Sequence, residues 1–106
     1  MYKIRSRSVF LNIDVPVSLP GIEAKIVYQL FINLGQDKKA LYDIDLIDIE
    51  DVYFMGLKVT DPRKFFDNQK SIGVDVEELL YQQAEVILNE EECQIIANKY
   101  LDLILL

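Results

Sequence analysis

One long run of alternating residues constrains the fold of this chain more than any other feature. Residues 22–34 read IEAKIVYQLFINL, in which apolar and polar side chains alternate over most of the length. Successive side chains of a β-strand point to opposite faces, so this period of two predicts a long strand with one buried face. The predicted buried face carries Ile22, Ala24, Ile26, Tyr28, Leu30, Ile32 and Leu34. Because a buried strand needs hydrogen-bonded partners, the rest of the chain must supply a sheet.

The N-terminal segment has a similar alternation. Residues 2–13 (YKIRSRSVFLNI) predict a first strand, and the apolar positions change face partway along it. A change of face requires an extra residue, so we expect a β-bulge near residues 6–8. Two prolines and a glycine follow within residues 14–21. They predict a loop there, because these residue types favour extended and turn geometry.

Two further strands are predicted in the middle of the chain. Residues 35–39 (GQDKK) have the composition of a hairpin turn, and residues 40–49 alternate again until the apolar positions change face after Leu46. An acidic pair at 50–51 interrupts the pattern, and residues 52–59 predict the last strand. Because these strands follow one another through short connections, we expect a three- or four-stranded antiparallel meander.

Helical signals begin after the last predicted strand. Asp61 followed by Pro62 predicts a short helical turn through residue 66, because Asp caps a helix well and Pro fits the first helical position. Asp75 with Glu78 three residues later forms a capping-box pattern, which predicts a helix over residues 75–88. The apolar stripe of this helix carries Val76, Leu79, Leu80, Ala84 and Ile87.

A second capping pattern predicts the last helix. Asn89 and Glu92 have the same spacing, which predicts a helix over residues 90–104. Its main apolar stripe carries Cys93, Ile96, Ala97, Tyr100 and Ile104. We expect the two C-terminal helices to pack on one face of the sheet, which makes the fold α+β in a single domain over residues 1–106.

The end of the last helix has more apolar residues than one small sheet can cover. Residues 100–106 read YLDLILL, so apolar side chains surround most of the helix. A helix of this kind must be buried on more than one side. We therefore expect a homodimer with an interface that contains Tyr100, Leu101, Leu103, Ile104 and Leu105. The alternative is that these residues leave the helix and add an edge strand to the sheet.

Charge and composition exclude several classes of function. The 18 acidic and 11 basic residues give a formal net charge of −7, which repels nucleic acids and anionic membranes. The chain has no histidine and one cysteine, Cys93, which excludes Ser-His-Asp and Cys-His catalysis and zinc sites of histidine or cysteine within one chain. No signal peptide or membrane-spanning run is evident, so we expect a cytoplasmic protein. We also expect that it has no cofactor. We expect the Cys93 thiol to pack in the core.

A run of acidic residues is the most conspicuous polar feature. It contains Asp43, Asp45, Asp48, Glu50 and Asp51. Clustered carboxylates can hold a hard cation such as Mg²⁺, but the change of face after Leu46 separates these residues, and their spacing is not that of an EF-hand. Cross-strand ion pairs with Lys3, Arg5 and Arg7 are a second role. The third role is an acidic face that covers a basic site on a partner protein.

Two other hypotheses come from different classes of function. Asp14, Glu23 and Lys25 resemble the acid and acid-x-lysine arrangement of metal-dependent nucleases, so the protein could be a Mg²⁺-dependent phosphodiester hydrolase with Asp14 and Glu23 as ligands. A small apolar ligand could instead lie between the sheet and the helices. Its pocket would be lined by Tyr28, Tyr42, Phe54 and Tyr81. The favoured hypothesis is a non-enzymatic, intracellular protein that binds itself and a basic partner protein, such as an acidic inhibitor, antitoxin or immunity-type protein.

Overall fold

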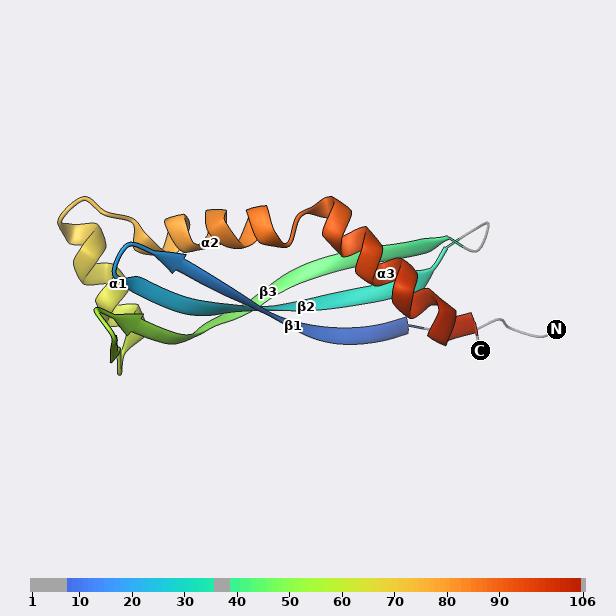
Figure 1. The fold of residues 1–106 in the computed structure, drawn as a ribbon, viewed down its shortest axis with the longest axis horizontal. Helices are drawn as coiled ribbons and strands as arrows, with labels where there is room; N and C mark the ends of the chain where they lie inside the picture. The colour runs from blue at the N-terminus through green and yellow to red at the C-terminus, as the bar shows by residue number, and fades with distance from the viewer. Residues whose placement is uncertain (1–7, 36–38, 106) are drawn as a thin grey trace.

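A computed structural model describes residues 8–35 and 39–105 of the chain. These residues contain four antiparallel strands and three helices, joined by turns and loops (Figure 1). The strands are β1 (Ser8–Leu19), β2 (Ile22–Leu34), β3 (Ala40–Phe54) and β4 (Leu57–Lys58), and each pairs with the next. The helices are α1 (Pro62–Ser71), α2 (Val76–Ile87) and α3 (Glu90–Leu105). The predicted α+β fold, an antiparallel meander followed by C-terminal helices, is confirmed. The described residues form three helices where two were expected.

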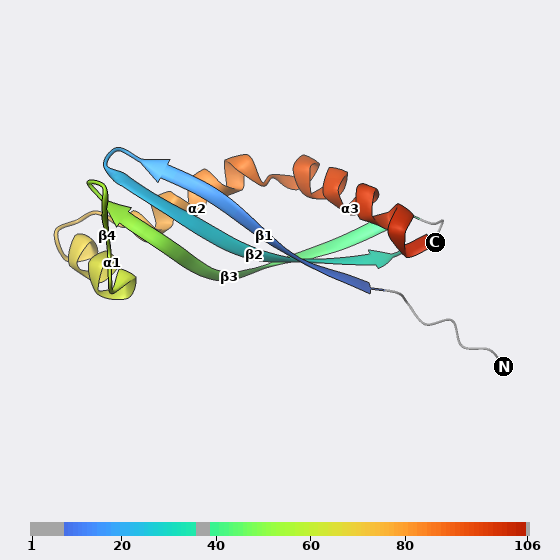
Figure 2. The same cartoon turned by 60° about the horizontal axis from the view of Figure 1, so that its bottom comes forward.

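The long strands make the molecule elongated. β3 has 15 residues, which at about 3.3 Å per residue extend for about 50 Å. The principal extents of the molecule are accordingly 60 × 24 × 22 Å. Figures 1 and 2 show the sheet twisting along its length, with α2 and α3 following one another along the same face. One face of the sheet is therefore covered by helices and the other is open.

Strand register assigns each side chain to the covered or the open face. Residues that lie directly opposite one another in antiparallel strands project to the same face. Val15 of β1 lies opposite Ile26 of β2, and Leu30 of β2 lies opposite Ile44 of β3. The covered face consists of the odd-numbered residues of β1, the even-numbered residues of β2, and Ala40, Tyr42, Ile44, Leu46, Ile49, Val52 and Phe54 of β3. The open face carries the intervening residues of β1 and β2 and, on β3, Leu41, Asp43, Asp45, Asp48, Glu50 and Tyr53.

β1 is longer at its C-terminal end than the sequence indicates. It pairs with β2 without interruption as far as Leu19, so the predicted loop over residues 14–21 is wrong. Pro16 lies within this strand. Because β1 is at the border of the sheet, a proline nitrogen that points outward costs no hydrogen bond of the ladder. Residues 2–7, including most of the predicted bulge, lie outside the described part of the chain.

The chain reverses between β1 and β2 in only two residues, Pro20 and Gly21. Gly21 has a φ of +80°, in the left-handed region that favours glycine. A β-carbon added at Gly21 would lie 2.9 Å from the sulfur of Met55, an exposed and flexible side chain that can move aside, so the positive φ is the main reason for glycine here. The Gly21 carbonyl accepts a 2.8 Å hydrogen bond from the Met55 N–H, which holds the two turns at this end of the sheet together.

β3 contains the strand predicted over residues 40–49 and continues through the beginning of the strand predicted over residues 52–59. The acidic pair at 50–51 does not end the strand, because Asp51 adopts a φ of +53° next to a shift in register. The chain turns instead at Met55 and Gly56, with φ values of +51° and +81°. Two consecutive positive φ values are typical of a tight hairpin turn, and only Leu57 and Lys58 remain for β4. The predicted change of face after Leu46 is confirmed, because the register shift there leaves Ile47 as an extra residue.

The predicted starts of the helices are confirmed by their caps. In each helix the capping side chain accepts a hydrogen bond from the backbone N–H three residues later. These bonds are made by Asp61 at 3.2 Å, Asp75 at 3.1 Å and Asn89 at 2.9 Å. α1 continues to Ser71, beyond the single turn expected through residue 66. None of the helices in the described residues has both the length and the apolar character that crossing a membrane requires.

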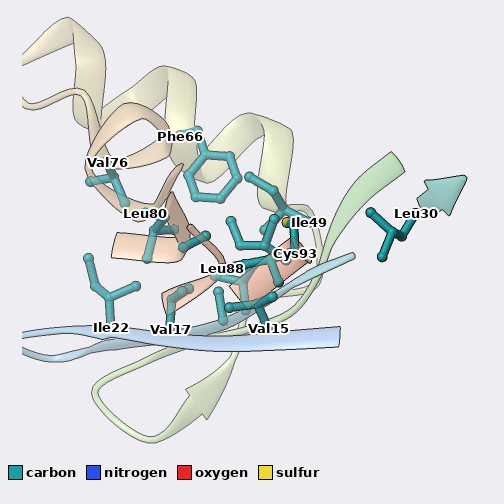
Figure 3. Close-up of a cluster of buried hydrophobic side chains, with 14 of the residues drawn as sticks. Val15, Val17, Ile22, Leu30, Ile49, Phe66, Val76, Leu80, Leu88 and Cys93 are labelled. Atoms are coloured by element: carbon teal, nitrogen blue, oxygen red, sulfur yellow. The ribbon is translucent and has the colours of Figure 1, made fainter. Parts of the chain in front are cut away.

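The hydrophobic core lies between the covered face and the helices. Figure 3 shows Val15 and Val17 of β1 facing Leu80 of α2 and Leu88, which follows α2. All four side chains are buried, together with Cys93 of α3, as expected for its thiol. The predicted stripe of α2 is only partly right. Val76, Leu80 and Ala84 are buried, whereas Leu79 and Ile87 are exposed, because a helix on one sheet buries a narrow part of its surface.

Candidate functional site

In the part of the chain that the structure describes, the outer edge of β3 is free over most of its length. β4 pairs only with Tyr53 and Phe54, and the Val59 N–H donates to the Val52 carbonyl. Near the other end, the Gln94 amide of α3 donates to the Ala40 carbonyl at 3.2 Å. Between these contacts no strand of the described residues pairs with the outer side of β3. A free edge of this length presents unpaired backbone N–H and C=O groups to solvent.

Apolar side chains of β3 remain exposed on the covered face. Ile44 and Leu46 lie opposite Leu30 and Tyr28, yet they are 37% and 46% exposed. The cause is the position of the helices, because α2 packs mainly over β1 and α3 packs over β2 and the beginning of β3. Ile47, the extra residue of the bulge, is 54% exposed. The middle of β3 is therefore an apolar surface that the helices leave uncovered.

A hollow of about 410 Å³ borders this surface, between β3, the beginning of α1 and α2. It is lined by Leu46, Ile47, Asp48, Ile49, Asp61, Pro62, Arg63, Phe66 and Tyr81. Arg63 of α1 joins its wall to α2 through a paired hydrogen bond with the Glu77 carboxylate, one arm of which measures 3.1 Å. The Tyr81 hydroxyl donates to the same carboxylate at 3.4 Å. Burial, reinforced by the charge of Glu77, raises the pKa of Tyr81 to about 12, so its hydroxyl stays protonated at neutral pH.

Three of the five predicted acidic residues line the open face of β3, where no residue of 8–35 or 39–105 forms an ion pair with them. Asp43, Asp45 and Asp48 lie opposite Phe31, Gln29 and Val27 of β2. No basic side chain of the described residues forms an ion pair with any of the three, although an Asp48 oxygen accepts a 2.8 Å hydrogen bond from the Ile49 N–H. The predicted partners Lys3, Arg5 and Arg7 lie outside the described residues. Within the described residues, this part of the acidic face has no cation of its own.

The other two acidic residues share one cationic partner, Lys25. Its ammonium lies 3.3 Å from both Glu50 and Asp51, and 3.7 Å from Asp14 of β1. Hydrogen bonds to Asp51 first, and then to Glu50, raise the pKa of Lys25 above its ordinary value. Within the described residues, the predicted acidic face thus has an end at 50–51 whose charge Lys25 offsets in part, and a stretch at 43–48 with no ion pair.

The geometry gives little support to the metal-dependent hydrolase. Asp14 lies opposite Val27 and Glu23 lies opposite Ser18, so the two carboxylates are four residue steps apart, about 13 Å along the strands. Two ligands of one Mg²⁺ ion would each lie about 2 Å from it. Lys25 contacts Asp14 but has its closest carboxylates on β3. Within residues 8–35 and 39–105, no three acidic or cysteine side chains are grouped as a metal site would require.

Of the four aromatic residues predicted to line a ligand pocket, Tyr81 lines the hollow beside β3. The other three make different contacts in the described residues. The Tyr42 hydroxyl donates to the Glu90 carbonyl at 3.4 Å, and the Phe54 ring packs against Phe65 with 5.3 Å between centroids. Tyr28 is partly buried against the core. These side chains mainly support packing between the sheet and the helices.

The predicted dimer interface is only partly described. Tyr100 and Leu101 pack against the core of their own chain and are partly buried. The side chains of Leu103, Ile104 and Leu105 lie outside the described part, although the backbone of α3 continues through residue 105. On the described surface of α3, Ile95 is the exposed large apolar residue, at 53%. Burial, and then the charges of Glu92 and Glu90, raise the pKa of the Cys93 thiol, which agrees with a packing role.

Two features of the site could not be found from the sequence. Arg63 and Glu77 are 14 residues apart on different helices, and no local pattern connects them. The free edge of β3 depends on the short length of β4, which is set by the turn at Met55 and Gly56. Gly56 was the available signal for that turn, because glycine favours positive φ values. Comparison with protein-family models, curated proteins and solved structures returns no match for this chain.

Proposed function

We propose that this is a non-enzymatic, cytoplasmic protein that binds another protein through β3. The observation that carries the proposal is the combination of two surfaces on one strand. Ile44, Leu46 and Ile47 are exposed apolar residues, and Asp43 and Asp45 are carboxylates without an ion-pair partner in the described residues. Contiguous exposed apolar side chains with polar residues beside them are typical of protein contacts.

Charge supports a basic partner. The chain has a net charge of −7, and the uncompensated carboxylates at 43–48 add a local concentration of negative charge to it. Complementary charge speeds association and selects among partners, while apolar contact supplies most of the affinity. An inhibitor, antitoxin or immunity-type protein that covers a basic site on its target would use both properties. Its activity would be the occlusion of that site.

A photo-crosslinking experiment tests the proposal. We would place the photoreactive residue p-benzoylphenylalanine at Ile47 in the full chain and irradiate living cells that express it. A matched chain would carry the same residue at Val86, which is 72% exposed on α2 and lies outside the β3 surface. We expect a discrete crosslinked protein from position 47 that is missing from position 86. No adduct at position 47, or the same adducts from both positions, would contradict binding through β3.

Self-association through α3 is a second part of the proposal, supported by the apolar residues of that helix. Sedimentation at micromolar concentration should then give about twice the chain mass of 12.3 kDa. Leu101 packs against the core, so its replacement would also disturb the fold. Ile95→Asp avoids that problem and should give monomers, because a buried unpaired carboxylate disfavours association. Val86→Asp is the exposed control and should stay dimeric. A monomeric parent chain would contradict this part.

A further inference from the structure

We infer that the free edge of β3 accepts an extended segment of the partner protein, in which Lys or Arg residues alternate with apolar residues. This inference rests on the proposed function and gives it a mode of binding and a partner chemistry. The segment would pair with the backbone of β3 between Asp43 and Ile49. It would continue the sheet by one strand on the side that β4 leaves open.

Backbone pairing is available because, among residues 8–35 and 39–105, β3 is bonded to another strand on one side only in this stretch. Residues 40–46 pair with β2 in an unbroken register, so alternate residues turn their N–H and C=O groups outward. In the described residues, no other strand pairs with those groups. Addition of a strand to such an edge is a common mode of peptide recognition, in which main-chain hydrogen bonds supply affinity and alternate side chains supply specificity.

The two faces of β3 determine the side chains that would fit. An added strand lies about 4.8 Å from β3 and projects its side chains alternately to the two faces of the sheet. Those on the covered face would lie beside Ile44 and Leu46, over the hollow between β3 and α1. Those on the open face would lie across from Asp43 and Asp45. Apolar residues suit the first position and cationic residues the second, so the favoured segment alternates the two.

The same charges disfavour a second copy as the occupant. If two β3 edges paired antiparallel about a two-fold axis near Asp45, acidic residues of one copy would lie opposite or diagonal to those of the other. Like charges directly across a sheet are destabilising. Charged side chains on an exposed edge strand are in fact a known protection against self-pairing. The edge therefore discriminates against copies of this chain and in favour of a basic segment.

The experiment uses the full chain and a capped ten-residue peptide of alternating Lys and Val. Nuclear magnetic resonance would follow the amide signals of the chain during titration, and hydrogen exchange would report new backbone bonds. We expect signals of residues 43–49 to shift and their outward amides to gain protection. A peptide of the same composition with Lys and Val in separate blocks should bind without that protection. An alternating Glu and Val peptide should not bind, because it repeats the charge of β3.

Matched variants separate local charge from net charge. The double variant Asp43→Asn with Asp45→Asn should bind the alternating Lys and Val peptide about tenfold more weakly than the parent chain does, as expected for the loss of two cross-strand ion pairs. The double variant Asp67→Asn with Glu91→Gln removes the same net charge at exposed positions on α1 and α3. It should change the affinity less than about twofold, because salt screens distant charges. Equal weakening by both double variants would contradict the inference.

The outcomes also distinguish this inference from the proposed function. If residue 47 crosslinks a partner but the alternating peptide gives no protection along β3, the protein binds through this surface without strand addition. That result would overturn the inference and leave the proposed function in place. If neither experiment gives a signal at β3, both are wrong.

Discussion

β2 and β3 carry nearly the same alternation of apolar residues, yet one strand is buried and the other is not. Leu30 of β2 is 0% exposed, whereas Leu46, the corresponding kind of residue on the same face of β3, is 46% exposed. β2 has a strand on each side and helices above it, while in the described residues the middle of β3 has one neighbouring strand and exposed side chains on its covered face. Alternation therefore predicts the faces of a strand, and the neighbours decide whether a face is buried.

Alanine substitutions at these two leucines test the comparison most strongly. Leu30→Ala should lower the free energy of unfolding by about 2–5 kcal/mol, because it removes buried methyl groups and leaves a cavity. Leu46→Ala should lower it by about 1 kcal/mol or less, because its side chain is half in water already. Urea denaturation followed by circular dichroism at low protein concentration measures both.

An equal loss at the two positions would break the comparison. It would mean that Leu46 is covered in solution by something other than this chain's helices. Repeating the Leu46→Ala measurement at a tenfold higher protein concentration distinguishes the causes. A loss that grows with concentration indicates cover by a second copy, which would contradict the basic partner inferred for this edge.

The difference between these strands also explains which parts of the fold could be predicted. Local signals were sufficient for β2, for the face change after Leu46 and for the helix starts at Asp75 and Asn89, because each depends on residues a few positions apart. The extent of β1 could not be predicted, because a proline interrupts a central strand but is tolerated in a strand at the border of a sheet, as Pro16 is in β1. Strand order, which places β1 at the border, is a property of the whole sheet.

The candidate site was predictable only in part for the same reason. The acidic residues at 43–51 were visible as a run, but their division depends on Lys25, a residue of another strand. The hollow beside Leu46 depends on where α1 and α2 pack, which no short pattern contains. The sequence predicts excess apolar surface on the last helix. The described part of the molecule shows the same kind of excess on β3, at Ile44, Leu46 and Ile47.

Lys25 of β2 offers a smaller test, because its ion pairs with Glu50 and Asp51 connect β2 to β3. Lys25→Gln should lower the urea midpoint at pH 7 by less than Leu30→Ala does, because exposed ion pairs are screened by water. The pKa of Lys25 is raised in the folded chain, chiefly by its hydrogen bond to Asp51. Its stabilising effect is therefore fully present below the ordinary lysine value of 10.5 and is lost as the pH rises through the higher folded value.

The pH dependence separates this charge effect from a packing effect. The difference in urea midpoint between the parent chain and Lys25→Gln should be constant near neutral pH and shrink above pH 10.5. Lys58→Gln is the matched control, because Lys58 is exposed on β4 and forms no ion pair with the described residues. A difference for Lys25→Gln that persists at high pH would show that its methylene chain packs between β2 and β3. The open face would then contribute to stability through apolar contact as the covered face does.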